Sequence, residues 1–383
     1  MKKHSKKFKI MLSAVIVLVI VLATAATCFA DGEASMPFQA EVFVNGSSIG
    51  NCTTIQDFNK LLTDNPGSGD MLVKSANRAS WHFWEPIVIP AGAEYRITFK
   101  MTDSTRGWYF KRGCGIRVEA DNVSLDFGHG PDFSDTYQQN EYGGLIYVTG
   151  DNFTLKNIDI SGTSAKYHGG AIYTEGNNTT IENCTFSNCT AEEYGGAIYA
   201  KNYGCKIKGC TFKECTAKGG WAGAVYLNYG GKSKKDLALI ENCDFNNCSA
   251  NGGYGEALFL GYDFIHVKGC QFYNTTVTDD ICYVGIHATD DVRFDNCDFK
   301  SNKAAEGYDE FVDIWGTKGY TVVQGCTSEN PNEDRFYHCN VDPNASGAVI
   351  SSGNLWIVIV GGVVVLGGIA AIIIVSKKKK KKA

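Results

Sequence analysis

The sequence lacks the patterns that usually mark a catalytic or metal-binding protein. It has 15 cysteines, but no two of them have the Cys-x-x-Cys spacing of a tetrahedral zinc site. It also has no phosphate-binding glycine loop, no nucleophile motif and no pair of catalytic carboxylates at a convincing spacing. We therefore expect no zinc and favour a protein without enzyme activity, although the question of activity stays open.

Basic residues cluster at the two ends of the chain, and between the ends they are outnumbered by acidic residues, 25 against 41. Five lysines lie within Met1–Lys9 and six within Lys377–Lys382, whereas all 41 Asp and Glu residues lie between residues 31 and 354. The long segment between the ends is therefore clearly acidic. We expect no nucleic-acid partner, because the phosphate backbone carries charge of the same sign.

The middle of the chain repeats one short pattern. Copies begin at Gly143, Gly169 and Gly195, which are 26 residues apart each time. Each copy contains two short runs of alternating apolar residues, separated by Gly-Gly pairs and Asn-rich turns, and this pattern favours strands. Because neither run can bury its apolar face alone, the copies must stack. The sequence therefore predicts an all-β fold, a right-handed parallel β-helix (solenoid) over residues 91–340.

Stacking would turn each repeat position into a column. One aliphatic column would face the interior: Ile146, Ile172, Ile198, Val225, Leu258, Ile286 and Ile314. A second column consists of cysteines: Cys184, Cys210, Cys243, Cys270, Cys297 and Cys326. Neighbouring coils would bring these cysteines within reach of disulfide bonds, but a free thiol also packs as a small apolar group. We favour buried thiols and leave the pairing open.

The repeat motif resembles that of a known group of surface proteins. Gly169-Gly-Ala-Ile172, Gly195-Gly-Ala-Ile198 and Phe299-Lys-Ser-Asn302 resemble the GGA[I/L/V] and Phe-x-x-Asn repeats of chlamydial polymorphic membrane proteins and related adhesin-like β-helix proteins. The resemblance covers residues 143–302, and elsewhere Phe-x-x-Cys replaces the second motif. It implies a β-helix and an adhesin-like role, although a fold does not by itself fix a function.

The N-terminal region predicts export followed by a cap. Residues 1–30 combine lysines, a long apolar run and a small residue at Ala30, as in a secretory signal peptide; an uncleaved anchor is the alternative. Residues 31–90 would form the N-terminal cap and the first irregular coils. Within them, Thr54 and Asp57 predict the start of a short amphipathic helix that would cover the apolar end of the solenoid.

The C-terminal region predicts a membrane anchor. Residues 341–354 would form a linker, and Leu355–Val375 contains no charge and is long enough to cross a bilayer as one transmembrane helix. The lysine-rich tail, 376–383, would be cytoplasmic under the positive-inside rule. We expect a single-pass protein of the cell membrane whose N-terminal part lies outside the cell.

Aromatic residues follow the inward aliphatic residue in most copies, so by strand alternation they should point outward. The column comprises Tyr147, Tyr173, Tyr199, Tyr226, Phe259, His287 and Trp315. A second aromatic set precedes the Gly turns: Tyr142, Tyr194, Trp221, Tyr254 and Tyr308. These rings could form a platform for a sugar or a protein, or they could stack on one another and shield the sheet.

Acidic residues gather in the later coils. Asp290, Asp291 and Asp313 could hold Ca²⁺, a cation that prefers several oxygen ligands, or they could form a solvated acidic face. Arg293 lies nearby in sequence and would be the base of a polysaccharide lyase similar in architecture to pectate lyases. We expect no other cofactor.

These observations give two hypotheses. The favoured one is a membrane-anchored, adhesin-like surface protein whose long β-helix face binds glycans or proteins. The alternative is a surface-tethered polysaccharide lyase or hydrolase.

Overall fold

The computed structural model describes residues 39–367 with gaps. The gaps are 76–80, 101–107, 111–114, 129–131, 134–139, 234–235, 252, 274–283, 288–291, 301–311, 316–320, 325, 329–335, 338–348, 353–354 and 361–362. The predicted signal peptide, 1–30, and lysine-rich tail, 376–383, lie outside the described residues. The proposed domain boundaries remain predictions.

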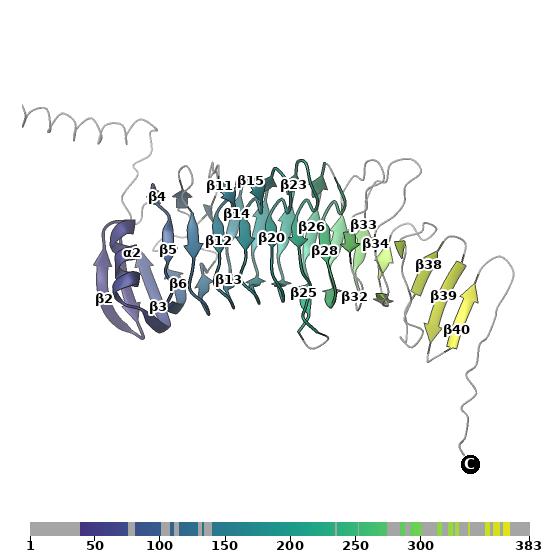
Figure 1. Ribbon diagram of the computed structural model, residues 1–383, viewed down its shortest axis with the longest axis horizontal. Coiled ribbons are helices and arrows are strands. Elements are labelled where there is room, and N and C mark those ends of the chain that lie inside the picture. The colour runs from purple at the N-terminus through teal and green to yellow at the C-terminus, as the bar shows by residue number, and fades with distance from the viewer. Residues whose placement is uncertain are drawn as a thin grey trace, which may run out of the picture.

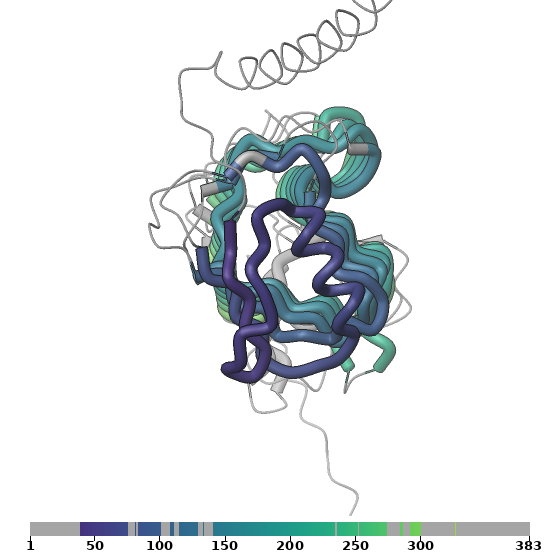
Figure 2. The backbone as a smooth tube through the Cα atoms, turned by 90° about the vertical axis from the view of Figure 1, so that its left-hand side faces the viewer, coloured from purple at the N-terminus to yellow at the C-terminus, as the bar shows by residue number. Residues whose placement is uncertain are grey.

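The chain winds into a stack of coils, and a regular coil contributes one short strand to each of four sheets (Figure 1). One such coil contains β16 (Ile172–Thr174), β17 (Thr180–Glu182), β18 (Thr185–Ser187) and β19 (Thr190–Ala191). We name the four sheets after these strands. Viewed along the stack, successive coils superimpose (Figure 2). The predicted all-β parallel β-helix is confirmed.

The β16 and β17 sheets run along most of the stack. The β16 sheet contains, in spatial order, β37 (Phe336–Tyr337), β34 (Val312–Trp315), β31 (Val284–His287), β28 (Leu258–Gly261), β24 (Val225–Leu227), β20 (Ile198–Ala200), β16, β12 (Ile146–Val148), β8 (Ile116–Val118) and β5 (Ile87–Ile89). The β17 sheet contains β2 (Ser47–Cys52), β1 (Ala40–Val44), β3 (Gly67–Ser75), β6 (Ala93–Lys100), β9 (Ser124–Asp126), β13 (Thr154–Lys156), β17, β21 (Lys206–Lys208), β25 (Ala238–Glu241), β29 (Ile265–Lys268), β32 (Val292–Asp295) and β35 (Thr321–Gln324).

The other two sheets are shorter. The β18 sheet contains β10 (Asp132–Phe133), β14 (Asp159–Ser161), β18, β22 (Thr211–Lys213), β26 (Asp244–Asn246), β30 (Gln271–Tyr273), β33 (Asp298–Lys300) and β36 (Thr327–Ser328). The β19 sheet contains β11 (Asn140–Tyr142), β15 (Ser164–His168), β19, β23 (Thr216–Ala217) and β27 (Ser249–Ala250). A further pair, β4 (Trp81–Phe83) and β7 (Trp108–Phe110), is also parallel.

The interior is built from columns of like side chains, one coil apart. Phe186, Phe212 and Phe245 are fully buried, and neighbouring ring centroids in this column lie 5.1 and 4.9 Å apart. The predicted cysteine column is also buried, except for half-buried Cys326, and all of its thiols are free. These thiols donate hydrogen bonds to backbone carbonyls; Cys210 Sγ, for example, lies 3.6 Å from the Ile181 oxygen. Burial of this apolar interior holds the coils together.

The repeated glycines are required where the chain turns into the β16 sheet. Gly169 has φ +67°, and a Cβ added there would lie 2.1 Å from the Ile172 carbonyl oxygen. A side chain is therefore excluded by backbone contact as well as by conformation.

The predicted N-terminal helix is present as α2 (Ile55–Asp64). Thr54 and Asp57 form a capping box at its start. The helix lies beside β5, the terminal strand of the β16 sheet, and the Asn59 amide donates to the Pro86 oxygen and accepts from the Val88 N–H, both at 2.9 Å. Figure 2 shows these N-terminal elements lying across the near end of the stack. That the helix acts as a stabilising cap stays a prediction.

The C-terminal apolar run is extended where the structure describes it. β39 (Leu355–Val360) pairs antiparallel with β38 (Val349–Ser352) and with β40 (Val363–Gly367). The structure therefore shows strands, not the predicted transmembrane helix, at these positions, and no helix within the described ranges is long and apolar enough to span a bilayer. β39 is rich in Val and Ile and β40 in Val, residues that favour β structure. An uninterrupted apolar run does not by itself distinguish helix from strand.

The register of the later coils differs from the predicted one by two residues. Leu258 pairs with Val284, not with Ile286, whereas the predicted pairing of Ile286 with Ile314 is present. Because side chains alternate with a period of two, a two-residue shift keeps aliphatic residues inside and leaves the apolar pattern unchanged. The pattern alone could not distinguish the two registers.

Charges of opposite sign alternate along one outer column of the β17 sheet. In register order the column reads Asp126, Lys156, Glu182, Lys208, Glu241, Lys268 and Asp295. Lys156 Nζ lies 2.9 Å from the Glu182 carboxylate, and Lys268 Nζ lies 3.2 Å from that of Glu241. Each charge therefore faces opposite charges on the neighbouring coils.

Candidate functional site

The predicted aromatic column lies on the outer side of the β16 sheet, apart from the main core. Its members Tyr147, Tyr173, Tyr199, Tyr226 and Phe259 pair in register. Neighbouring ring centroids are 4.9–5.4 Å apart, and their planes differ by at most 15°. Each interior ring therefore uses both faces to contact its neighbours.

The second aromatic set packs against this column and closes most of it from solvent. Tyr194 lies 5.2 Å from Tyr226, and His168, which takes a tyrosine position in this set, lies 4.7 Å from Tyr199, both between ring centroids. As a result Tyr199 is only 9% exposed and Phe259 only 3%. Burial raises the pKa of Tyr199 to about 12. The shielding interpretation thus describes the inner column, and its rings do not form an open platform.

The register correction removes His287 and Trp315 from this column. Phe259 pairs with Gly285, which pairs with Asp313, so a glycine and an aspartate occupy the next two positions. Trp315 instead pairs with His287 in the column of Gly261. The predicted pairing of His287 with Trp315 is therefore present, and only their place in the column of Phe259 was wrong, because the apolar pattern permits a two-residue shift.

The structure does not describe the side chains of the predicted calcium ligands. Asp290 and Asp291 lie outside the described residues, as does the side chain of Asp313. Within the described ranges, no three His, Cys, Asp or Glu side chains come close enough together to hold a metal ion. Calcium binding therefore stays a prediction.

Arg293, the candidate base of the enzyme hypothesis, belongs to a small charged cluster on the β17 sheet. Its Nη2 lies 3.3 Å from Asp295 Oδ2, and the same carboxylate lies 2.8 Å from His266 Nε2. The guanidinium is therefore engaged in an ion pair, on a different sheet from the aromatic column.

A polar column runs beside the aromatic one on the β16 sheet. It comprises Thr149, Glu175, Lys201, Asn228 and Gly261, the residues two positions beyond the aromatic ones. Lys201 Nζ lies 2.9 Å from the Glu175 carboxylate, which also accepts a hydrogen bond from the Tyr173 hydroxyl at 3.2 Å. The outer face of this sheet thus combines aromatic edges with groups that can exchange hydrogen bonds.

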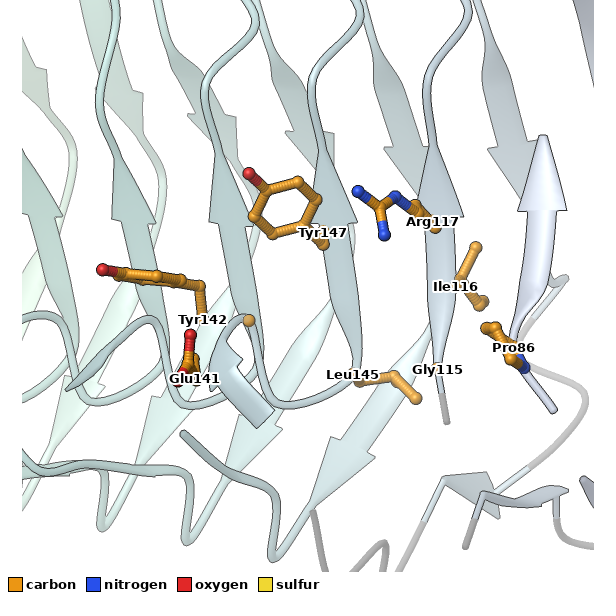
Figure 3. A pocket seen from close by; sticks show the side chains of 9 residues that line it. Pro86, Gly115, Ile116, Arg117, Glu141, Tyr142, Leu145 and Tyr147 are labelled. Atoms are coloured by element: carbon orange, nitrogen blue, oxygen red, sulfur yellow. The ribbon is translucent and has the colours of Figure 1, made fainter. Parts of the chain in front are cut away.

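A cavity of about 340 Å³ opens at the N-terminal end of the aromatic column. Pro86, Arg117, Tyr142 and Tyr147 are among the residues that line it (Figure 3). The Arg117 guanidinium lies over the Tyr147 ring, 5.5 Å from its centroid, and its Nε lies 3.0 Å from the Glu119 carboxylate. This end of the column is therefore already covered by a cation.

A second cavity, of about 440 Å³, opens at the other end of the column. It is lined by Trp221, Tyr226, Asn228, Tyr254, Phe259, Gly261 and Tyr262. Tyr254 and Tyr262 are 40% and 46% exposed, in contrast to the buried rings of the inner column. We call this space the aromatic cavity.

The sequence pattern indicated four of the five aromatic residues of this cavity, all except Tyr262. It did not indicate Asn228. A signal for Tyr262 was present, because Tyr203, Tyr229 and Tyr262 recur shortly after successive strands of the β16 sheet. In the structure these three rings stack, with centroids 4.7 and 4.8 Å apart. Asn228 has no comparable signal, since its column changes residue type at every coil.

Comparison with known proteins supports the fold and goes no further. A family model described as a right handed beta helix region matches residues 108–234. No curated protein and no solved structure matches the chain. The coils described above therefore form a right-handed parallel β-helix.

Proposed function

We propose that this right-handed β-helix is a non-catalytic, adhesin-like surface protein that binds a glycan or protein partner along the outer face of its β16 sheet. The observation that carries the proposal is the pair of cavities at the two ends of one continuous aromatic column. Small-molecule and glycan sites favour concave, largely aromatic surfaces with a few polar groups, and this face has both.

The surface location is part of this proposal. It is supported by the signal-like residues 1–30, by the uncharged run 355–375 and by the six lysines that follow that run. The resemblance of the Gly-Gly-Ala-Ile repeats to those of chlamydial polymorphic membrane proteins supports the same role.

A matched pair of attachment sites tests which face binds. Lys201 directly follows β20 of the β16 sheet, and Lys268 ends β29 of the β17 sheet. Both are 47% exposed, and each pairs with a glutamate of the preceding coil. Lys201→Cys and Lys268→Cys variants of the full chain, in a polyoxyethylene detergent, would be coupled to a maleimide polyethylene glycol. Retention on an array of polysaccharides and surface proteins, and release of shortened chains, would then be recorded.

We expect polymer at position 201 to lower retention at least tenfold and polymer at position 268 to change it less than twofold. Wild-type protein treated with the same reagent is the control, because the described native thiols are largely buried. Equal effects at both positions would contradict binding on the β16 sheet. Release of shortened polysaccharide chains by the wild type would instead establish the enzyme hypothesis.

A further inference from the structure

The aromatic cavity lies beside two positions of the repeat that lack side chains, Gly261 in its wall and Gly285 in the next strand. The polar column carries Glu175, Lys201 and Asn228 in successive coils and then Gly261. The aromatic column likewise ends at Phe259, which pairs with Gly285 in the next strand. A hollow results over β28, and an exposed tyrosine stands at each end of that strand: Tyr254 before it and Tyr262 after it.

Aromatic rings at several inclinations make up most of the cavity wall. The Trp221 ring lies 4.6 Å from Phe259 at 39° and 5.9 Å from Tyr254 at 72°. A glycine at position 253 leaves room for the indole, since a Cβ there would lie 1.7 Å from Trp221 Cδ1. Such an arrangement presents ring faces and edges from more than one side.

The wall offers few hydrogen bonds relative to its aromatic surface. Apart from the hydroxyls and the indole N–H carried by the rings, Asn228 supplies the only polar side chain among the described residues that line the cavity. A sugar ring carries several hydroxyls, and each one that leaves water without a partner costs free energy. A quaternary ammonium group has no hydrogen-bond donor, and aromatic faces are its preferred environment.

The charges on the molecule also favour a cationic ligand. Arg117 covers the first ring of the aromatic column, and Lys232 lies 5.7 Å from the centroid of Tyr203, the first ring of the Tyr203–Tyr229–Tyr262 stack. Both stacks therefore take a cation at their N-terminal end, and both reach the aromatic cavity at the other. Between residues 31 and 354 the chain carries 41 acidic and 25 basic residues, and this net negative charge favours a cation.

We propose that the aromatic cavity binds a quaternary ammonium group, such as the trimethylammonium of choline, carried by the partner that the β16 sheet holds. This inference rests on the proposed function and names the chemical group that the face recognises. The trimethylammonium group would contact the rings of Trp221, Tyr254 and Tyr262. The remaining volume would take the atoms that link it to the partner.

The test is calorimetric titration of the full chain, in a polyoxyethylene detergent, with choline. The comparison ligand is the tert-butyl analogue of choline, in which carbon replaces the charged nitrogen and the shape is kept. We expect the analogue to bind at least tenfold more weakly. We also expect Tyr262→Leu to weaken choline binding at least fivefold, because leucine keeps apolar volume but removes the aromatic ring.

Tyr203→Leu is the matched control, since it removes a ring from the same stack outside the cavity; it should change choline affinity less than twofold. Equal affinity for choline and its tert-butyl analogue would overturn the proposal. Binding of neutral methyl glycosides without binding of choline would also overturn it and would assign the cavity to sugars.

The two proposals fail in different ways. If choline does not bind but polymer at position 201 still blocks retention, the function stands and the ligand assignment falls. If polymer at positions 201 and 268 acts equally, binding on the β16 sheet falls whatever choline does.

Discussion

Glu256 occupies the position that earlier coils fill with Gly170, Gly196 and Gly223. Its side chain is 2% exposed, and one carboxylate oxygen accepts a hydrogen bond from the Ala250 N–H. Ala250 belongs to β27, the last strand of the β19 sheet within the described ranges. The carboxyl group thus provides an acceptor where the next coil would otherwise supply one. Burial, opposed by that hydrogen bond, raises the pKa of Glu256 from 4.5 to about 7.

This pKa predicts how stability changes with pH. Between pH about 4.5 and about 7 the folded state binds more protons than the unfolded state, so stability falls as pH rises through this window. Glu256→Gln keeps the acceptor and cannot ionise, so it should remove that part of the slope and be more stable than wild type above pH 7, by on the order of 3 kcal/mol. Urea midpoints measured from pH 4 to 8 provide the test, and identical slopes in both proteins would refute the assignment.

At the scale of elements, one side chain of α2 provides hydrogen-bond partners for backbone groups at the edge of the β16 sheet. Asn59 exchanges two hydrogen bonds with the backbone around β5, as a neighbouring strand would. Asn59→Ala should therefore lower stability by about 2 kcal/mol, or about 1 kcal/mol for each bond, and should speed hydrogen exchange at the Val88 amide. Lys60→Ala is the control on the same helix, because its ion pair with Asp64 is exposed and should contribute less than about 1 kcal/mol. Equal effects of the two changes would argue against the cap.

The elements also show what the sequence could and could not predict. The repeat spacing predicted the coils, and the hydroxyl–acid pair Thr54 and Asp57 predicted α2, because these signals are local. The pairing of Phe259 with Gly285 was missed, since a two-residue shift leaves every apolar residue facing inward. The sequence left open whether Tyr199 is shielded or exposed, because its burial depends on contacts between the corner residue of one coil and the strand of another.

At the scale of the whole molecule, the proposed anchorage of the chain in a membrane can be tested directly. We expect the full chain to stay in the membrane pellet after an alkaline carbonate wash, because residues 355–375 carry no charge. A chain ending at Asn354 should be released into the supernatant. Release of the full chain by the same wash would contradict anchorage by this segment.

The alternating charges on the β17 sheet limit how a rod of this kind can change in length. Removing one coil would place Lys156 beside Lys208, or Glu182 beside Glu241, and like charges directly opposite each other are destabilising. Removing or duplicating two adjacent coils preserves the alternation at the junction. Gene duplications and deletions within this chain should therefore be tolerated best in units of two repeats.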